Sequence, residues 1–150
     1  MSQPGAFRAA AVLAVAAVAA CSVRMLDLSD VAVEAAPDAN NNAAVAVEVV
    51  LLTRAGLGEQ LAKLTDADWF RRRTQLQRDN PDGVQVLSWE LVPGQSTTMP
   101  VGRTVLDVYV FANYASPGDH RARLTIEGSA ARVKLQATDF VVEGQKKQEP

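Results

Sequence analysis

Short segments in which apolar and polar residues alternate, separated by turn signals, recur along most of this chain. Alternation with a period of two predicts half-buried β-strands, because successive side chains of a strand point to opposite faces. We predict seven or eight strands, at residues 26–35, 43–52, 84–92, 97–101, 105–112, 121–127, 132–136 and 140–142. This many short strands joined by turns predicts a mainly β fold, a two-sheet antiparallel β-sandwich.

Breaks in the alternation predict irregularities in these strands. The phase changes near Ser29 and Asp30, which predicts a β-bulge in the first strand. Residues 43–52 are almost entirely apolar, so both faces of that strand should be buried. Pro100 and Gly102 are expected to end the short strand at 97–101.

The strand patterns also predict which side chains face the core. The residues expected to point inward from residues 84–92 are Leu87, Trp89 and Leu91. The residues expected to face solvent from residues 121–127 include Arg121, Arg123 and Thr125.

Between the second and third strands the apolar residues recur with a helical period. Leu57, Leu61 and Leu64 predict a short helix, and Thr65 and Asp68 predict a capping box that starts a second helix at about 66–77. Its packed face is expected to contain Trp69, Phe70, Arg73 and Leu76, and its solvated face Arg71, Arg72 and Arg78. The sandwich therefore carries a short helical insertion after the second strand.

The N-terminal apolar run, residues 9–20, is too short for the roughly 20 residues of a membrane-spanning helix. It follows one basic residue, Arg8, and ends in Val18-Ala19-Ala20-Cys21, which resembles a bacterial lipobox, whose cysteine carries the lipid after cleavage. The alternative is an ordinary secretory signal in which Cys21 lies after the cleavage site by chance.

The lipobox divides the chain into four parts. We predict a lipoprotein signal peptide at 1–20, a lipid-bearing tether at 21–25, a β-sandwich domain at 26–143 and a polar tail at 144–150. At about 3.5 Å per extended residue the tether spans less than ~20 Å, so the domain should lie close to the membrane.

Composition limits the partners of the mature chain. Removal of residues 1–20, whose only charged side chain is Arg8, leaves a mildly acidic chain with no long basic run, so nucleic acid is not an expected partner. Cys21 is the only cysteine, so no disulfide can stabilise the fold. A chain of this length can bury about two thirds of its unfolded surface, which is enough for one domain.

Several segments, in their order along the chain, resemble the TssJ-type lipoproteins of the bacterial type VI secretion system. They are the lipobox, Asp38-Ala39-Asn40 leading into AVAVEVVLLT, then LTDADWF, WELVPGQ and VLDVYVFANY, spread from about residue 28 to 143. The resemblance implies a transthyretin-like sandwich attached by its lipid to the outer membrane and facing the periplasm. It also implies that the domain binds the periplasmic C-terminal domain of an inner-membrane TssM-like partner. Ser22 after the lipid cysteine suits this sorting.

The loop between the first two strands is the connection through which the resemblance implies contact with TssM. We predict that Asp38, Asn40, Asn41 and Asn42 bind the partner, because amides and a carboxylate lie on a segment that a turn alone does not explain. The alternative is that these side chains only satisfy local backbone groups, as Asx residues commonly do. The loop is short for the family, and His120 replaces an expected aromatic, so the contact should be weaker or displaced.

The sequence offers little for catalysis or cofactor binding. The only histidine, His120, has Asp119 beside it and Ser116 in the same loop, a spacing that does not make a triad. Asp79 and Asp82 lack the spacing of a calcium loop, and Gly56-x-Gly58 lacks the rest of a phosphate-binding motif. We predict no catalytic site, metal, cofactor or small-molecule substrate.

Two other functions remain open from the sequence. A lipoprotein that binds a small ligand or a glycan would need an exposed aromatic platform and a pocket. An envelope hydrolase would need a cleft around His120.

Overall fold

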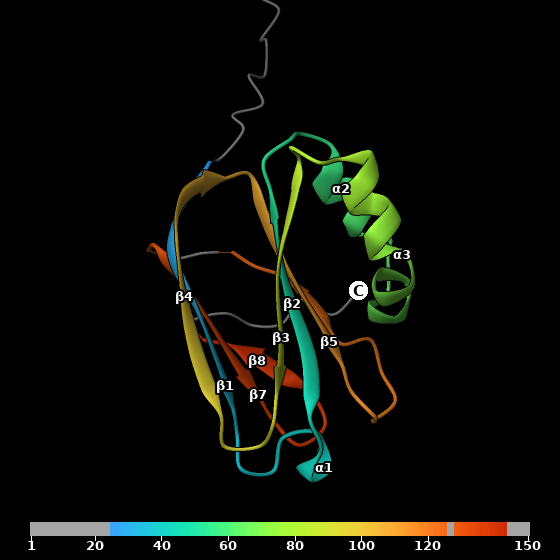
Figure 1. Cartoon of the computed structure of the whole chain (residues 1–150), viewed down its shortest axis with the longest axis vertical. Helices are drawn as coiled ribbons and strands as arrows, with labels where there is room; N and C mark the ends of the chain where they lie inside the picture. Colours follow the sequence, from blue (N-terminus) through green and yellow to red (C-terminus); the bar gives the residue numbers. More distant parts are fainter. Residues whose placement is uncertain (1–24, 126–127, 144–150) are drawn as a thin grey trace, which may run out of the picture.

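The computed structural model describes residues 25–125 and 128–143 of the chain (Figure 1). The predicted signal peptide, Cys21 and the tail lie outside these residues. The described strands form two four-stranded sheets that pack face to face, as predicted. One sheet has the order β4 (Ser96–Val105), β1 (Leu26–Ala35), β7 (Ala130–Leu135), β8 (Phe140–Val142). The other has the order β3 (Val84–Leu91), β2 (Val45–Leu52), β5 (Asp107–Asn113), β6 (Arg121–Arg123).

The predicted pattern of strands and helices is confirmed in outline. The register of β1 shifts between Leu28 and Asp30, where the bulge was expected. β2 is buried on both faces, as its composition predicts. The helices α2 (Leu57–Leu61) and α3 (Asp66–Asp79) lie between β2 and β3, so the helical insertion is where the sequence places it.

One strand pairing departs from the antiparallel prediction. β1 and β7 run parallel, with Val31 opposite Ala131 and Val33 opposite Val133. Alternation predicts which side chains of a strand share a face. A strand buries that same face whether it runs parallel or antiparallel to its neighbour. The direction of this pair therefore depends on the path of the chain between the sheets, which the local pattern does not contain.

Several strands differ in their bounds from the prediction, and β4, β5 and β6 show what causes the difference. β4 continues through Pro100 and Gly102, because it lies at a sheet edge and Pro100 faces Asp30 at the β1 bulge, where the ladder is already irregular. Val105 consequently belongs to β4, and β5 starts at Asp107. β6 ends at Arg123, and residues 126–127 of its predicted extension lie outside the described residues.

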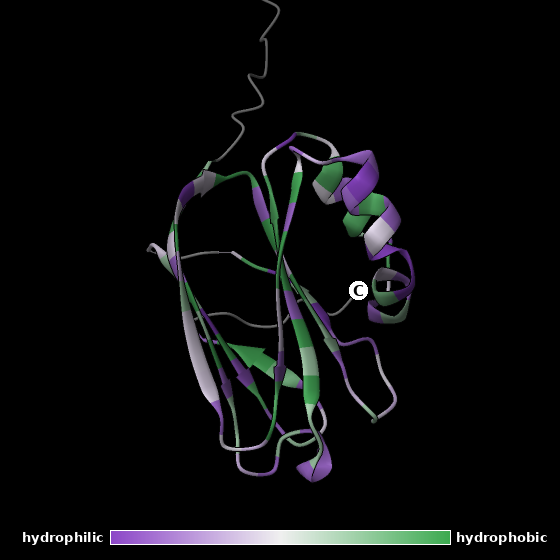
Figure 2. Ribbon diagram, viewed as in Figure 1, coloured by the Kyte–Doolittle hydropathy of each residue, from purple (hydrophilic) through white to green (hydrophobic). Residues whose placement is uncertain are grey.

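The core between the sheets is apolar, as Figure 2 shows by its colouring. It includes the buried side chains of Leu28, Val31, Val33, Val47, Val49, Leu51, Val108, Val110, Val133, Leu135 and Phe140. Leu87 and Leu91 belong to it as predicted, but Trp89 is only partly buried. Trp89 lies on β3, at the edge of its sheet, where the facing sheet covers the side chain incompletely.

A second apolar cluster lies between α2, α3 and the outer face of β2 and β5. Trp69 of α3 is 0% exposed and stacks on Phe111 of β5 with 4.9 Å between ring centroids. The predicted capping box is present, since the Thr65 hydroxyl accepts from the N–H of Asp68 and the Asp68 carboxylate accepts from that of Thr65. The pKa of Asp68 is lowered by the N–H and the hydroxyl of Thr65, which both donate to its carboxylate, and by Arg71.

Arg123 and Thr125 are exposed, as predicted, whereas Arg121 is only partly exposed. Arg121 donates to the carbonyl oxygens of Ala62 and Leu64 at 2.6 and 2.5 Å, which ties β6 to the end of α2. Arg123 makes a two-pronged ion pair with Asp107 at 2.7 and 2.8 Å, and this contact raises its pKa. Alternation placed both residues on the outer face correctly, but the helical insertion and the start of β5 lie against that face.

Candidate partner-binding surface

Four connections meet at one end of the sandwich. Strand register places residues 36–44, 92–95, 114–120 and 136–139 together, because Ala35 faces Leu135, Glu34 faces Ser96, and Ala46 faces Asn113. The opposite end contains the start of β1, where Leu26 faces Val105. β1 has ten residues, so the two ends are about 30 Å apart. In Figure 1, α1 (Ala39–Asn42) lies at the bottom and β1 begins at the top.

The α1 segment is a left-handed turn. Asn40, Asn41 and Asn42 have φ values of 47°, 52° and 66°, and the ψ values of the first two are 42° and 48°. Side chains with a Cβ rarely adopt this conformation, and asparagine is among the residues that tolerate it best. The three successive asparagines therefore do have a structural reason, contrary to our expectation that a turn does not explain them.

Asn40 behaves differently from its neighbours. It is only 5% exposed, its Nδ2 donates to the carbonyl oxygen of Ala44 at 2.8 Å, and its Oδ1 accepts from the N–H of Ala115 at 2.8 Å. This side chain satisfies backbone groups, which is the alternative that the sequence left open. The other predicted contact residues, Asp38, Asn41 and Asn42, are exposed.

The turn between β7 and β8 is fixed to the same structure. The N–H groups of Asn40 and Asn41 donate to the carbonyl oxygens of Gln136 and Ala137, each at 3.0 Å. The Tyr114 hydroxyl donates to the carbonyl oxygen of Asp139 at 2.7 Å and accepts from the N–H of Gln136 at 3.1 Å. Burial raises the pKa of Tyr114, so this hydroxyl remains a neutral donor.

His120 is a buried part of this end of the molecule, with 4% exposure. Its Nδ1 lies 3.1 Å from the Asp139 carboxylate, and its Nε2 lies 3.0 Å from the carbonyl oxygen of Ser116. Its ring packs on Tyr114 with 4.8 Å between centroids, so it fills the place of the expected aromatic. The Ser116 hydroxyl donates instead to the carbonyl oxygen of Thr138 at 3.2 Å, so the imidazole and this hydroxyl do not form a nucleophile–base pair.

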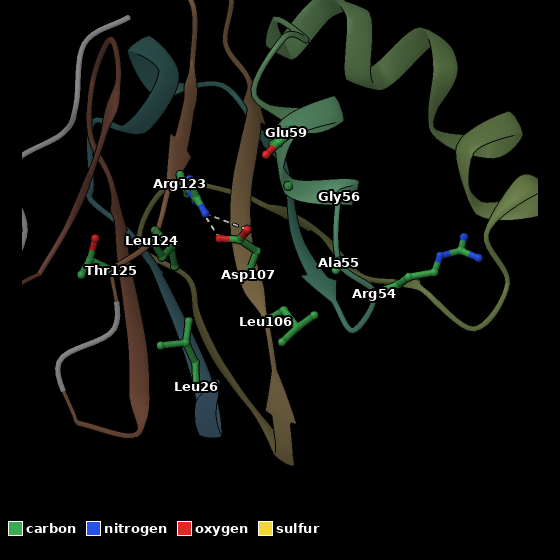
Figure 3. Close-up of a pocket in the computed structure, with 11 residues that line it drawn as sticks. Leu26, Arg54, Ala55, Gly56, Glu59, Leu106, Asp107, Arg123, Leu124 and Thr125 are labelled. Carbon is green, nitrogen blue, oxygen red and sulfur yellow. Dashed lines mark hydrogen bonds and ion pairs between the residues drawn. The ribbon is translucent and has the colours of Figure 1, made fainter. Parts of the chain in front are cut away.

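One described pocket lies near the other end of the sandwich, where β1 begins (Figure 3). Its volume is about 510 Å³, and the lining includes Leu26, Arg54, Glu59, Asp107 and Arg123. Arg123 is bound to Asp107, and Arg54 points away from that pair and donates to Asn80. No aromatic side chain lines it, so the pocket lacks the platform that a glycan site needs.

Metal binding and membrane spanning were also considered for the described part of the chain. Residues 25–125 and 128–143 contain no group of three or more His, Cys, Asp or Glu side chains placed to hold a metal ion. Nor does any helix in these ranges have the length and apolar character needed to cross a membrane. Cys21, the predicted lipidation site, lies outside them.

Comparison with known proteins identifies the fold. No family model matches the chain, and no curated protein matches its sequence. Among solved structures, the T6SS lipoprotein TssJ1 from Pseudomonas aeruginosa is similar, with a TM-score of 0.54, 14% identity, and coverage of 79% of this chain and 96% of that one.

Two further structures of the type VI secretion system are also similar. One is a chain in the structure described as the T6SS protein TssM C-terminal domain (869-1107) from EAEC, with a TM-score of 0.54, 13% identity, and coverage of 79% and 96%. The other is a chain of a type VI membrane complex, with a TM-score of 0.57, 13% identity, and coverage of 81% and 98%. The chain therefore has the β-sandwich fold of the TssJ lipoproteins of the type VI secretion system.

Proposed function

We propose that this chain is a lipid-anchored component of the type VI secretion membrane complex, held at the outer membrane and facing the periplasm. In this role it binds the periplasmic C-terminal domain of a TssM-like inner-membrane partner. The observation that carries the proposal is the fold, which matches proteins of this secretion system over 96–98% of their chains.

The proposed partner is supported by the likeness to the structure whose description names the TssM C-terminal domain. The fold of this chain matches a chain of that structure. This supports a complex between the two kinds of protein.

The geometry of the sandwich suits an anchor at one end and a partner at the other. Met25 follows Cys21 by four residues and directly precedes β1, so the lipid would hold the β1 start close to the membrane. The α1 turn lies at the opposite end, about 30 Å further into the periplasm. The exposed Asp38, Asn41 and Asn42 would then point toward a partner that arrives from the inner membrane.

Replacement of Cys21 tests the anchor. Cys21→Ser should abolish lipidation and membrane association but leave the fold intact, because the residue precedes every described strand. Acyl chains supply about 0.8 kcal/mol of membrane affinity per buried CH₂. Metabolic labelling with palmitate should mark the wild type alone, and circular dichroism should be the same for both proteins. A wild type that takes up no label would refute the lipoprotein assignment.

Replacement of the exposed turn residues tests the partner. Asp38→Ser, Asn41→Gly and Asn42→Gly together should weaken binding to the TssM-like domain at least tenfold, about 1.4 kcal/mol. Glycine accepts the left-handed backbone at both asparagine positions, so the melting temperature should stay within a few degrees. Calorimetry on the lipid-free domain measures the affinity. Unchanged affinity in a folded variant would exclude these three side chains as contacts.

A further inference from the structure

We propose that the partner surface is composite and that Asn40 is its positioning residue. The connection 36–44 and the loop 114–120 would act as one surface because the buried amide of Asn40 holds them together. The inference rests on the proposed function for the identity of the partner. It adds a second loop to the interface and gives Asn40 a role without direct contact.

The contacts of Asn40 carry the first step. Its side chain bridges Ala44, in its own connection, and Ala115, in a loop 75 residues away. The left-handed backbone at Asn40 brings this amide to the inside of the turn, where 5% of the residue is exposed. Loss of the bridge would leave the N–H of Ala115 without that acceptor, and a backbone group that lacks its partner is unfavourable when water is excluded.

The same loops are also held by the turn between β7 and β8. His120 contacts Asp139, the Tyr114 hydroxyl bonds to Asp139 and Gln136, and the N–H of Asn40 bonds to Gln136. Three connections far apart in sequence thus support one another. A partner that binds such a preformed surface avoids the cost of ordering separate loops.

The charge of this end indicates the chemistry of the partner. The connections 36–44, 92–95, 114–120 and 136–139 contain no Lys or Arg. Of their carboxylates, Asp119 pairs with Arg121 at 2.8 Å and Asp139 contacts His120, whereas Asp38 is exposed and makes no ion pair within the described residues. The other exposed side chains of this end include Asn41, Asn42, Gln95, Gln136, Pro37, Pro117 and Val92. This surface fits a partner patch that presents hydrogen-bond donors and positive charge.

A matched pair of asparagine variants tests the positioning role. Asn40→Gly and Asn41→Gly both keep a left-handed residue that glycine accepts, but only the first removes the bridge to Ala115. We expect Asn40→Gly to raise the hydrogen-exchange rate of the Ala115 amide at least tenfold and to weaken binding of the TssM-like domain at least fivefold. Asn41→Gly should leave the Ala115 exchange rate unchanged. Faster exchange with unchanged affinity would overturn the positioning role.

Substitutions at an exposed proline test the second loop independently of Asn40. Pro117→Lys should weaken binding at least tenfold at low salt, Pro117→Glu should weaken it much less, and Pro81→Lys, in an exposed turn at the other end, should not change it. Equal effects of Pro117→Lys and Pro81→Lys would overturn the composite surface. Equal effects of the Lys and Glu variants at 117 would overturn the positive partner patch.

Different measurements decide whether the protein binds the TssM-like domain and whether Asn40 couples the two loops. A wild-type protein that does not bind the TssM-like domain would refute the proposed function. The coupling of the two loops would then be decided by the Ala115 exchange rate, and an unchanged rate in Asn40→Gly would refute it.

Discussion

Trp69→Ala is expected to lower the free energy of unfolding by roughly 3–5 kcal/mol, the range for removal of a large buried aromatic. The side chain is 0% exposed, stacks on Phe111, and donates from Nε1 to Glu48 at 2.7 Å. Its loss would open a cavity between α3 and the sheet and leave the Glu48 carboxylate short of a donor. The measurement is urea denaturation, with the change read from the midpoint at constant slope.

Trp89→Ala is the matched control for this substitution. Trp89 is the other tryptophan of the chain, and it is only partly buried on edge strand β3. Truncation there should cost less than about 2 kcal/mol, because part of its apolar surface already contacts water. Equal losses for the two variants would contradict the assignment of Trp69 as the aromatic that fixes α3 to the sheet.

The contrast between the two tryptophans illustrates what the sequence contains. Alternation in β3 and the helical period of α3 placed both side chains on apolar faces correctly. How deeply each face is covered depends on strand order, and β3 is at an edge whereas α3 lies over β5. Strand order is set by long-range pairing, and the same limit explains why the parallel pairing of β1 and β7 was not predicted.

The candidate surface was predictable in place but not in detail. The sequence identified the turn that contains Asn40, but the left-handed backbone of all three successive asparagines was not predicted. The bridge from Asn40 to Ala115 and the contact of His120 with Asp139 join residues 75 and 19 positions apart. No local periodicity reports such contacts. A useful signal was the single histidine at a position where the fold family is expected to carry an aromatic ring.

The buried Glu48 network is expected to give the second large effect. Glu48 lies on the outer face of β2, is 2% exposed, and accepts from Trp69 Nε1, from the Ser88 hydroxyl at 3.0 Å, and from Arg73. A buried carboxylate is costly unless donors surround it, and here α3 supplies two of the three. The network therefore fixes how α3 sits on the sheet, which hydrophobic contacts alone specify less precisely.

Glu48→Ala should destabilise the protein by about 3 kcal/mol, because it leaves the buried Nε1–H of Trp69 without an acceptor and removes the partner of Arg73. Arg73 is partly exposed and can turn to solvent, so most of the loss should come from the indole. The Trp69→Phe background has no indole N–H that needs an acceptor. In that background Glu48→Ala should therefore lower the free energy of unfolding by at least 1 kcal/mol less than it does in the wild type. Strict additivity of the two unfolding free energies would mean that the Trp69–Glu48 hydrogen bond contributes nothing, and that Arg73 and apolar packing hold α3 in place without it.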